Sequence, residues 1–319
     1  MGSVSAQDIH FSQFNTNPVY LNPAQAGFYF ARFRATANHR SQWRAVTVPF
    51  NSFIGGVDFK VFNDKYSRNI IGAGVMAYYD QAGDSKFGTS SGALALSYIR
   101  SLSQFNNNYL SFGMKASYND RSYDYTALMF DNQFNGKTYD PSIHNGESLL
   151  YRGFNYFDLS AGVHWFMKPS SDLSFNAGFA LSHLNTPEQS FLDNSEVKLD
   201  RKLVVYGNAE ISTSNKQSYR PGLYFARQGT YTEIIAGSYI DFDSYSATSG
   251  FSIVSAGLFF RPVDAAILIV GFEYAGVDFG ISYDVNYSGL RKASSFRGGF
   301  ELSAIYLLNK KKRSNNKKK

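Results

Sequence analysis

The motif most suggestive of catalysis is "GTSSG" at Gly88–Gly92, which matches the G-x-S-x-G pattern of a nucleophile elbow. That elbow holds its serine on a sharp turn between a strand and a helix. The residues that follow, "ALALSYIR", alternate apolar with small or polar side chains and predict a strand instead. "NGKT" at Asn135–Thr138 resembles the end of a phosphate-binding loop, but Asp131 stands where the first glycine of that loop belongs. We therefore predict that the protein is not an enzyme. A membrane-embedded hydrolase that uses Ser90 is the weakest of the three functional hypotheses that the sequence offers.

Metal ligation is no better supported. "DFD" at Asp241–Asp243 offers two carboxylates, but Tyr245 breaks the spacing of a calcium loop. The chain has no cysteine, which excludes disulfides and thiolate metal sites. No two histidines stand at metal-ligand spacing: His10, His39, His144, His164 and His183. His164 alternates onto a polar face, where we expect a hydrogen bond in a polar interior. We predict neither metal nor cofactor.

Isolated charged side chains form a third candidate set. They fall on the small and polar faces of segments that alternate like strands. Together with His164, the predicted inward polar residues are Asp58, Lys60, Lys115, Asp158, Glu210 and Glu301. The set contains both positive and negative side chains in near balance, which favours ion pairs among them or contacts with a plug. In an open pore the same groups would set ion selectivity.

Segments of about ten residues with strict alternation must position these side chains. In "NYLSFGMKASYND", apolar side chains from Leu110 to Tyr118 take one face, and Ser111 to Asn119 take the other. We count about fourteen such segments and no convincing amphipathic helix between them. They begin near Phe28, Phe53, Ile70, Ser90, Asn108, Phe154, Ser171, Arg201, Ser218, Tyr231, Phe251, Ala265, Val277 and Gly299.

The composition favours a membrane barrel over a soluble sandwich. Aromatic residues make up 17% of the 319 residues and charged residues only 18%. The longest apolar run, Ala265–Phe272, is far shorter than the ~20 residues of a spanning helix. The second face of each segment holds Gly, Ser and Asn rather than Lys and Glu, and Tyr and Phe gather at the segment ends. Lipid outside, a polar lumen and two aromatic girdles account for this pattern. We predict an all-β fold: a transmembrane antiparallel β-barrel of about 14 strands over residues 28–308, with an N-terminal plug or periplasmic segment.

Connection lengths indicate the orientation. In the first half of the chain short links alternate with longer ones, as short periplasmic turns alternate with external loops. With an even strand count, both termini are then expected on the periplasmic side of the outer membrane. The longest loop, from Asp120 to Gly153, is either functional or a cap on the barrel. Its external candidates are Tyr123, Tyr125, Phe130, Phe134 and Tyr139.

The leader at residues 7–27, "QDIHFSQFNTNPVYLNPAQAG", has neither helical nor strand periodicity. We predict that it is an ordered plug or docking segment, and a disordered tether is the alternative. Its prolines would keep it off a strand edge. The residues expected to fill gaps or bind a partner are Phe11, Ser12, Gln13, Phe14, Asn17, Pro18, Leu21, Asn22, Pro23 and Gly27. Residues 1–6 are interpreted as a signal-peptide remnant or an added start, and residues 309–319 as a basic periplasmic tail, a poor nucleic-acid module.

Both ends of the chain resemble one family. "QDIHFSQF", "NPVYLNPAQAGF" and "HRSQW" (His39–Trp43) resemble the Q-D-x-x-F-S-Q, L-N-P-A-x-A-G and R-x-Q-W elements that open the PorP/SprF family of Bacteroidetes. "GISYDVNYSGLRKASSFRGGFELSAIY", Gly280–Tyr306, resembles the family's S-Y-D-x-x-x-S-x-L…G-x-x-E-x-S close. The basic tail beyond Leu308 departs from barrels that end on an aromatic residue. The combination is specific, although each piece alone is weak.

The resemblance implies an outer-membrane barrel of the type IX secretion system. Such a protein is expected to bind, help export or anchor a secreted cell-surface adhesin through the adhesin's C-terminal domain, and some of these adhesins serve gliding motility. Expected partners are type IX secretion components, a periplasmic peptidoglycan-binding lipoprotein among them, and outer-membrane lipid, but no nucleic acid. The alternative is a passive channel, or a transporter of hydrophobic substrates with an N-terminal plug.

Overall fold

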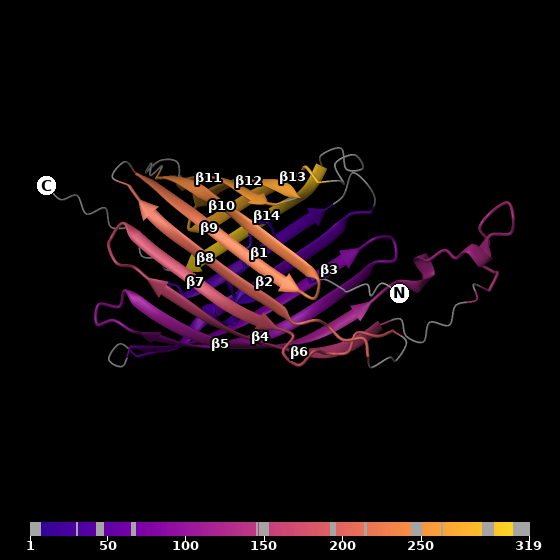
Figure 1. Cartoon of the computed structure of the whole chain (residues 1–319), viewed down its shortest axis with the longest axis horizontal. Helices are drawn as coiled ribbons and strands as arrows, with labels where there is room; N and C mark the ends of the chain where they lie inside the picture. The colour runs from indigo at the N-terminus through magenta and orange to yellow at the C-terminus, as the bar shows by residue number, and fades with distance from the viewer. Residues whose placement is uncertain are drawn as a thin grey trace.

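The structure is a computed structural model that describes residues 8–29, 31–42, 48–64, 68–144, 146, 153–191, 196–213, 216–243, 251–262, 264–288 and 297–308. Trp43, residues 1–6 and residues 309–319, all addressed by the sequence analysis, lie outside these ranges. Within them, fourteen strands form one closed antiparallel barrel in which β1 pairs with both β2 and β14 (Figure 1). The predicted fold class is therefore confirmed.

The strands are β1 (Phe33–Gln42), β2 (Phe50–Asp64), β3 (Asn69–Ala82), β4 (Phe87–Ser101), β5 (Asn108–Ser122), β6 (Gly153–Met167), β7 (Leu173–Ser182), β8 (Lys202–Ser212), β9 (Gln217–Gln228), β10 (Tyr231–Asp243), β11 (Phe251–Arg261), β12 (Ala265–Tyr274), β13 (Val277–Asn286) and β14 (Arg297–Leu308). The short helices are α1 (Pro18–Leu21) and the 3-10 turns η1 (Pro23–Gln25), η2 (Tyr125–Ala127) and η3 (Asp131–Gln133). No helix among the described residues is long and apolar enough to cross a membrane.

Five predicted strand starts coincide with the structure: Asn108, Tyr231, Phe251, Ala265 and Val277. The largest error is at β1, which begins at Phe33 rather than near Phe28, because the residues before it still belong to the segment inside the barrel. β4 begins at Phe87 rather than near Ser90, since β3 and β4 are joined by a short turn with positive φ at Gly83 and Lys86.

Alternation sets the two surfaces of the wall. On β5, Phe112 and Met114 are exposed outward, whereas Ser111 and Lys115 are buried inside. Leu94 and Leu96 on β4 are also exposed outward. A lipid-facing wall accounts for so many exposed apolar side chains, since large apolar patches are rare on soluble monomers. Inward positions hold small and polar side chains together with a cluster of buried apolar and aromatic ones, such as Ile235, Phe259 and Ile267.

The two ends of the barrel differ. At the end where β1 begins and β14 ends, here called the short-turn rim, brief links join β2 to β3, β4 to β5 and β6 to β7. The opposite end, the long-loop rim, carries the β5–β6 and β7–β8 loops. In the second half the contrast fades, because residues 229–230 and 262–264 make short links at the long-loop rim.

Candidate functional site

The candidate site is the barrel lumen, which contains residues 8–29, here called the lumen segment. At the long-loop rim, Asp8 contacts His183, directly after β7, and its N–H donates to Gln228 at the end of β9 (3.1 Å). At the other end, the Arg32 N–H donates to the Leu308 carbonyl (3.0 Å) at the short-turn rim. The lumen segment therefore runs through the barrel from one rim to the other.

The described chain begins and ends at opposite rims, with Asp8 at the long-loop rim and Leu308 at the short-turn rim. The expectation that both termini lie on one side concerns residues 1–7 and 309–319, which lie outside the described ranges. The length of the lumen segment accounts for its path. An extended chain rises more than 3 Å per residue, so about twenty residues are ample to cross the barrel before β1 starts.

Prolines and one glycine shape the lumen segment locally. Pro18 starts α1 and Pro23 starts η1, positions where a missing N–H costs no hydrogen bond. The Asn22 side chain accepts from the Ala24 N–H (2.9 Å) and caps η1. Gly27 has φ +67°, and a Cβ there would lie 2.8 Å from the Gly72 Cα. The two prolines thus start tight turns in the lumen segment, and these turns keep it from lying along a strand edge.

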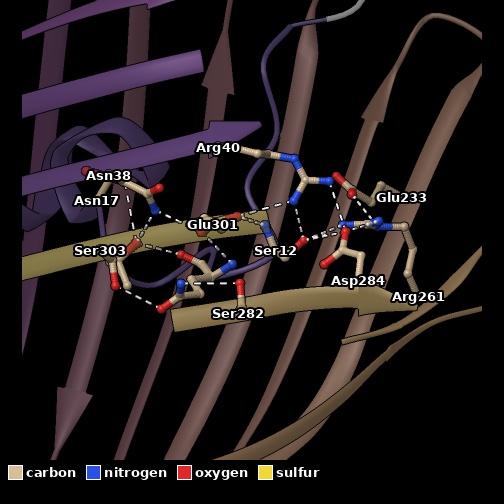
Figure 2. A network of polar contacts seen from close by, with 12 residues as sticks. Ser12, Asn17, Asn38, Arg40, Glu233, Arg261, Ser282, Asp284, Glu301 and Ser303 are labelled. Atoms are coloured by element: carbon tan, nitrogen blue, oxygen red, sulfur yellow. Dashed lines mark hydrogen bonds and ion pairs between the residues drawn. The ribbon is translucent and has the colours of Figure 1, made fainter. Parts of the chain in front are cut away.

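A buried polar cluster holds the first part of the lumen segment; we call Ser12, Gln13, Arg40, Asp284 and Glu301 the anchor cluster (Figure 2). The fully buried Glu301 carboxylate accepts hydrogen bonds from the N–H groups of Ser12 (2.8 Å) and Gln13 (3.1 Å). Arg40 donates to Asp284 (2.9 Å) and to Glu301 (3.3 Å). The Ser12 hydroxyl donates to Asp284 (2.8 Å). Wall and segment thus share one network of ion pairs and hydrogen bonds.

Neighbouring side chains complete the anchor cluster. Asn38 donates to Glu301 (2.8 Å), and Ser303 donates to the side-chain oxygen of Gln13 (2.8 Å). Arg261 lies 2.9 Å from Glu233 and 3.3 Å from Asp284 (Figure 2). Because the charges of the anchor cluster are paired and hydrogen-bonded, their burial is tolerated.

A second contact point is at the long-loop rim. His183 lies between two carboxylates, with its Nε2 2.9 Å from Asp8 and its Nδ1 2.9 Å from Asp158. Lys202 is 3.5 Å from Asp8. Burial lowers the pKa of His183, but the two carboxylates outweigh burial and raise that pKa to about 9. The imidazole is therefore charged at neutral pH and bridges the lumen segment to the wall.

The middle of the lumen segment packs directly against the backbone of the barrel wall. Asn22 donates to the backbone carbonyls of Val163 (2.8 Å) and Phe179 (3.2 Å). Gly113 leaves room for the turn: a Cβ there would lie 2.3 Å from the Ala24 nitrogen. Small residues at inward positions therefore have a packing role.

Apolar and aromatic side chains of the lumen segment fill the gaps, as the sequence predicts for this kind of segment. Phe14 stacks on Tyr224 with ring centroids 5.2 Å apart, and Phe11 packs edge-on against Tyr20. The predicted segment residues that are buried are Phe11, Ser12, Gln13, Phe14, Asn17, Pro18, Leu21, Asn22, Pro23 and Gly27. Their binding partner in the structure is the wall of their own barrel.

The predicted inward charges all face the lumen, and several contact the lumen segment. Asp58 is bound by Arg34 (2.9 Å) and by the Gly27 N–H (2.7 Å). Lys60 donates to the Tyr29 carbonyl. Glu210 is half-buried and lines a 240 Å³ cavity.

The other two predicted inward groups contact aromatic rings. The Lys115 ammonium lies 5.4 Å from the centroid of the Tyr20 ring. His164 shares a hydrogen bond with the Tyr206 hydroxyl (2.8 Å), as its polar-face position suggests. Four inward residues are not among the predicted ones: Arg34, Arg40, Arg261 and Asp284. Simple alternation could have identified Arg34 and Arg40, which share one face of β1.

The long β5–β6 loop extends away from the barrel end (Figure 1) and does not fold into the lumen over its described residues. Phe134 is 60% exposed and forms a bridge with Tyr139. Tyr125 packs on Phe130 with centroids 5.8 Å apart. Tyr123 instead packs on Phe191 of the β7–β8 loop (5.1 Å). The predicted external aromatics therefore split between a projecting tip and the barrel rim.

Among the described residues, no group of three or more His, Asp or Glu side chains could hold a metal ion. "GTSSG" lies within β4, with Ser90 exposed and no helix after it. These residues lack the strand–turn–helix geometry of a nucleophile elbow.

The comparisons with known proteins agree with this architecture. Solved structures with a similar fold include the toluene transporter TbuX of Ralstonia pickettii, at 10% identity over 90% of this chain and 91% of that chain, with a TM-score of 0.52. The toluene transporter TodX of P. putida is similar at 8% identity over 89% and 91%, with a TM-score of 0.50. At these identities the likeness extends to the outer-membrane barrel fold alone. No curated relative matches the chain. The family described as type IX secretion system membrane protein PorP/SprF matches residues 3–306, and the chain therefore belongs to that family of outer-membrane β-barrels.

Proposed function

We propose that this barrel is a non-enzymatic component of type IX secretion that binds a secreted cell-surface adhesin and helps to export or anchor it. The adhesin's C-terminal domain docks at the long-loop rim, which faces the cell exterior. Secretion components, including a periplasmic peptidoglycan-binding lipoprotein, bind at the short-turn rim. Gliding adhesins are among the expected clients.

The observation that carries the proposal is the occupied lumen of a barrel from a secretion family. Residues 8–29 run from rim to rim. Asp8 holds one end through His183 and Lys202, and the Gly27 N–H bond to Asp58 holds the other. A barrel filled in this way is better suited to hold a partner than to conduct solutes. The projecting β5–β6 loop supplies the exposed apolar side chains that protein interfaces use, with Met129 75% and Phe134 60% exposed.

The test is co-purification from outer membranes through a tag placed after Leu308. We expect a secreted adhesin and secretion components to accompany the wild-type barrel. Replacing Phe134 and Met129 by serine should reduce adhesin recovery several-fold while secretion components remain. The matched control is Phe105→Ser, since Phe105 is 86% exposed in the β4–β5 turn at the opposite rim.

Two results would refute the proposal. The first is that neither adhesin nor secretion component accompanies the barrel and that deletion of its gene leaves surface adhesins in place. The second is a stable open current in planar bilayers that changes with Lys115 or Asp158. That current would favour the alternative of a channel or transporter.

A further inference from the structure

The inference concerns a cavity of about 590 Å³ at the long-loop rim, here called the mouth cavity. Its floor includes Asp8–His10 of the lumen segment, and its walls come from the ends of several strands. A cavity of this size holds a small molecule or a few residues of a peptide. The contacts that hold the lumen segment in place do not depend on a molecule bound in the mouth cavity.

Arg121, on β5, lines the mouth cavity and is 8% exposed. Its guanidinium donates to two neutral groups, the Thr89 hydroxyl (3.0 Å) and the Gln189 side-chain oxygen (2.7 Å). It also lies 5.9 Å from the centroid of the Phe87 ring. No described carboxylate lies within ion-pair distance of it.

The other buried or half-buried arginines inside the barrel behave differently. Arg34, Arg40, Arg220 and Arg261 each contact at least one carboxylate at 2.6–2.9 Å. Arg121 is thus the exception within the described wall. A guanidinium has more N–H donors than its two neutral bonds use, and a buried charge without a counter-charge is costly.

A second charged group, the half-buried Asp80, lies on the same row of the wall. The strand register places Ser52, Asp80, Thr89 and Arg121 side by side across β2, β3, β4 and β5. The backbones of Asp80 and Arg121 are therefore two strands apart, which is roughly 10 Å across the sheet. The Asp80 carboxylate accepts from the Ser52 hydroxyl, and no described basic group lies within ion-pair distance of it.

The remaining charges of the mouth cavity are engaged elsewhere. Arg261 is 2.9 Å from Glu233 and 3.0 Å from Asp264, and Asp8 is held by His183. Asp80 and Arg121 are left as one acceptor and one cation facing the same space. A simple anion would meet repulsion from Asp80. A ligand with a carboxylate and a nearby N–H donor would satisfy both groups.

We propose that the mouth cavity binds a carboxylate with an adjacent N–H donor, the chemistry of a peptide's C-terminal end or of a free amino acid. Arg121 takes the carboxylate through paired N–H donors, the geometry that arginine offers best. Asp80 accepts from the amide or ammonium group. The exposed face of Phe87 provides contact area for an apolar side chain.

The test measures binding to the purified full-length barrel in detergent, so it does not depend on any secretion partner. The probes are acetyl-Ala-Ala-Phe with a free carboxylate, the same peptide with a C-terminal amide, and free phenylalanine. We expect saturable binding of at least one free-carboxylate probe. Arg121→Gln should weaken that binding by at least about thirtyfold, the lower bound for losing one partner of a buried hydrogen-bonded charge pair. Arg227→Gln is the matched control, because Arg227 is exposed near the same rim and lines no cavity described above.

Amide exchange at Ser12 reports whether the Arg121→Gln barrel is still folded around its lumen segment. Binding of the peptide alone would assign the site to chain ends, and equal or tighter binding of phenylalanine would assign it to free amino acids. Asp80→Asn should weaken either ligand while the preference for a free carboxylate remains. Equal binding of the acid and amide peptides, unchanged binding in a folded Arg121→Gln barrel, or no saturable binding of any probe would overturn the inference.

Discussion

Replacement of Glu301 by alanine is expected to release the first part of the lumen segment while the barrel stays closed. The Glu301 carboxylate is fully buried and accepts the backbone N–H groups of Ser12 and Gln13 at 2.8 and 3.1 Å. Each hydrogen bond to a charged group contributes about 1.5–3 kcal/mol, so the two together contribute at most about 3–6 kcal/mol. Arg40 keeps Asp284 as a partner at 2.9 Å, which limits the damage to the wall.

Hydrogen exchange of the two amides measures this loss directly. A change of 1.4 kcal/mol is a factor of ten, so protection of Ser12 and Gln13 should fall on the order of a hundredfold or more. Glu301→Gln should give an intermediate value, because its amide oxygen accepts one bond without the charge. The Gly27 amide, bound to Asp58 at 2.7 Å near the other rim, should keep its protection.

The control is Asp120→Ala, which removes an exposed carboxylate from the outer face of β5. It should leave exchange at both amides unchanged. If Ser12 and Gln13 exchange within about threefold of wild type in both Glu301 variants, the carboxylate is not the anchor that the geometry indicates. Equal loss at Gly27 would mean that the whole barrel, not the segment, had been destabilised.

Three further outcomes are expected. Burial lowers the pKa of His183 and the two adjacent carboxylates raise it to about 9, so the stabilisation from its ion pair with Asp8 is complete below about pH 6.5 and is lost as the pH rises through about 9; the protection of the Asp8 amide, relative to the base-catalysed exchange of an unfolded chain at the same pH, should fall over that range in wild type but not in His183→Gln. Gly113→Ala should lower stability by about 1–3 kcal/mol in denaturant unfolding, since its Cβ would press on the lumen segment, whereas Gly92→Ala, with open space around its Cβ, should have a much smaller effect. An epitope ahead of Asp8 should bind antibody on intact cells, and one after Leu308 should not; the opposite result would contradict the assigned direction of the segment.

Much of the barrel can be predicted from alternation alone. The fourteen strands and five of their first residues follow from the period of two, because lipid outside and polar groups inside leave each position a single choice of face. The start of β1 cannot be found in this way. Residues 28–32 have the aromatic and basic composition of a strand end, but the described ones, 28, 29, 31 and 32, precede β1 on the path out of the lumen.

The site is less predictable, because its partners are far apart in sequence. Alternation correctly puts Asp58, Lys115 and Glu301 inside, and the leader's composition suggests a plug. The pairing of Glu301 with Ser12 spans 289 positions and depends on how the chain is threaded. No local pattern specifies that the leader enters at the long-loop rim.

The anchor cluster also has a consequence for the order of folding. The barrel closes where β1 meets β14, and Arg40 and Glu301 are directly opposite each other across that closing pair. Both contact Ser12, so the lumen segment lies over the strand pair that joins the two ends of the barrel. If the lumen segment were still outside when β1 and β14 paired, it would have to thread through a closed barrel. If it were bound earlier, it could guide the pairing of the two strands. Such distant contacts make folding slow, and we expect leader capture to be the committed step that precedes closure.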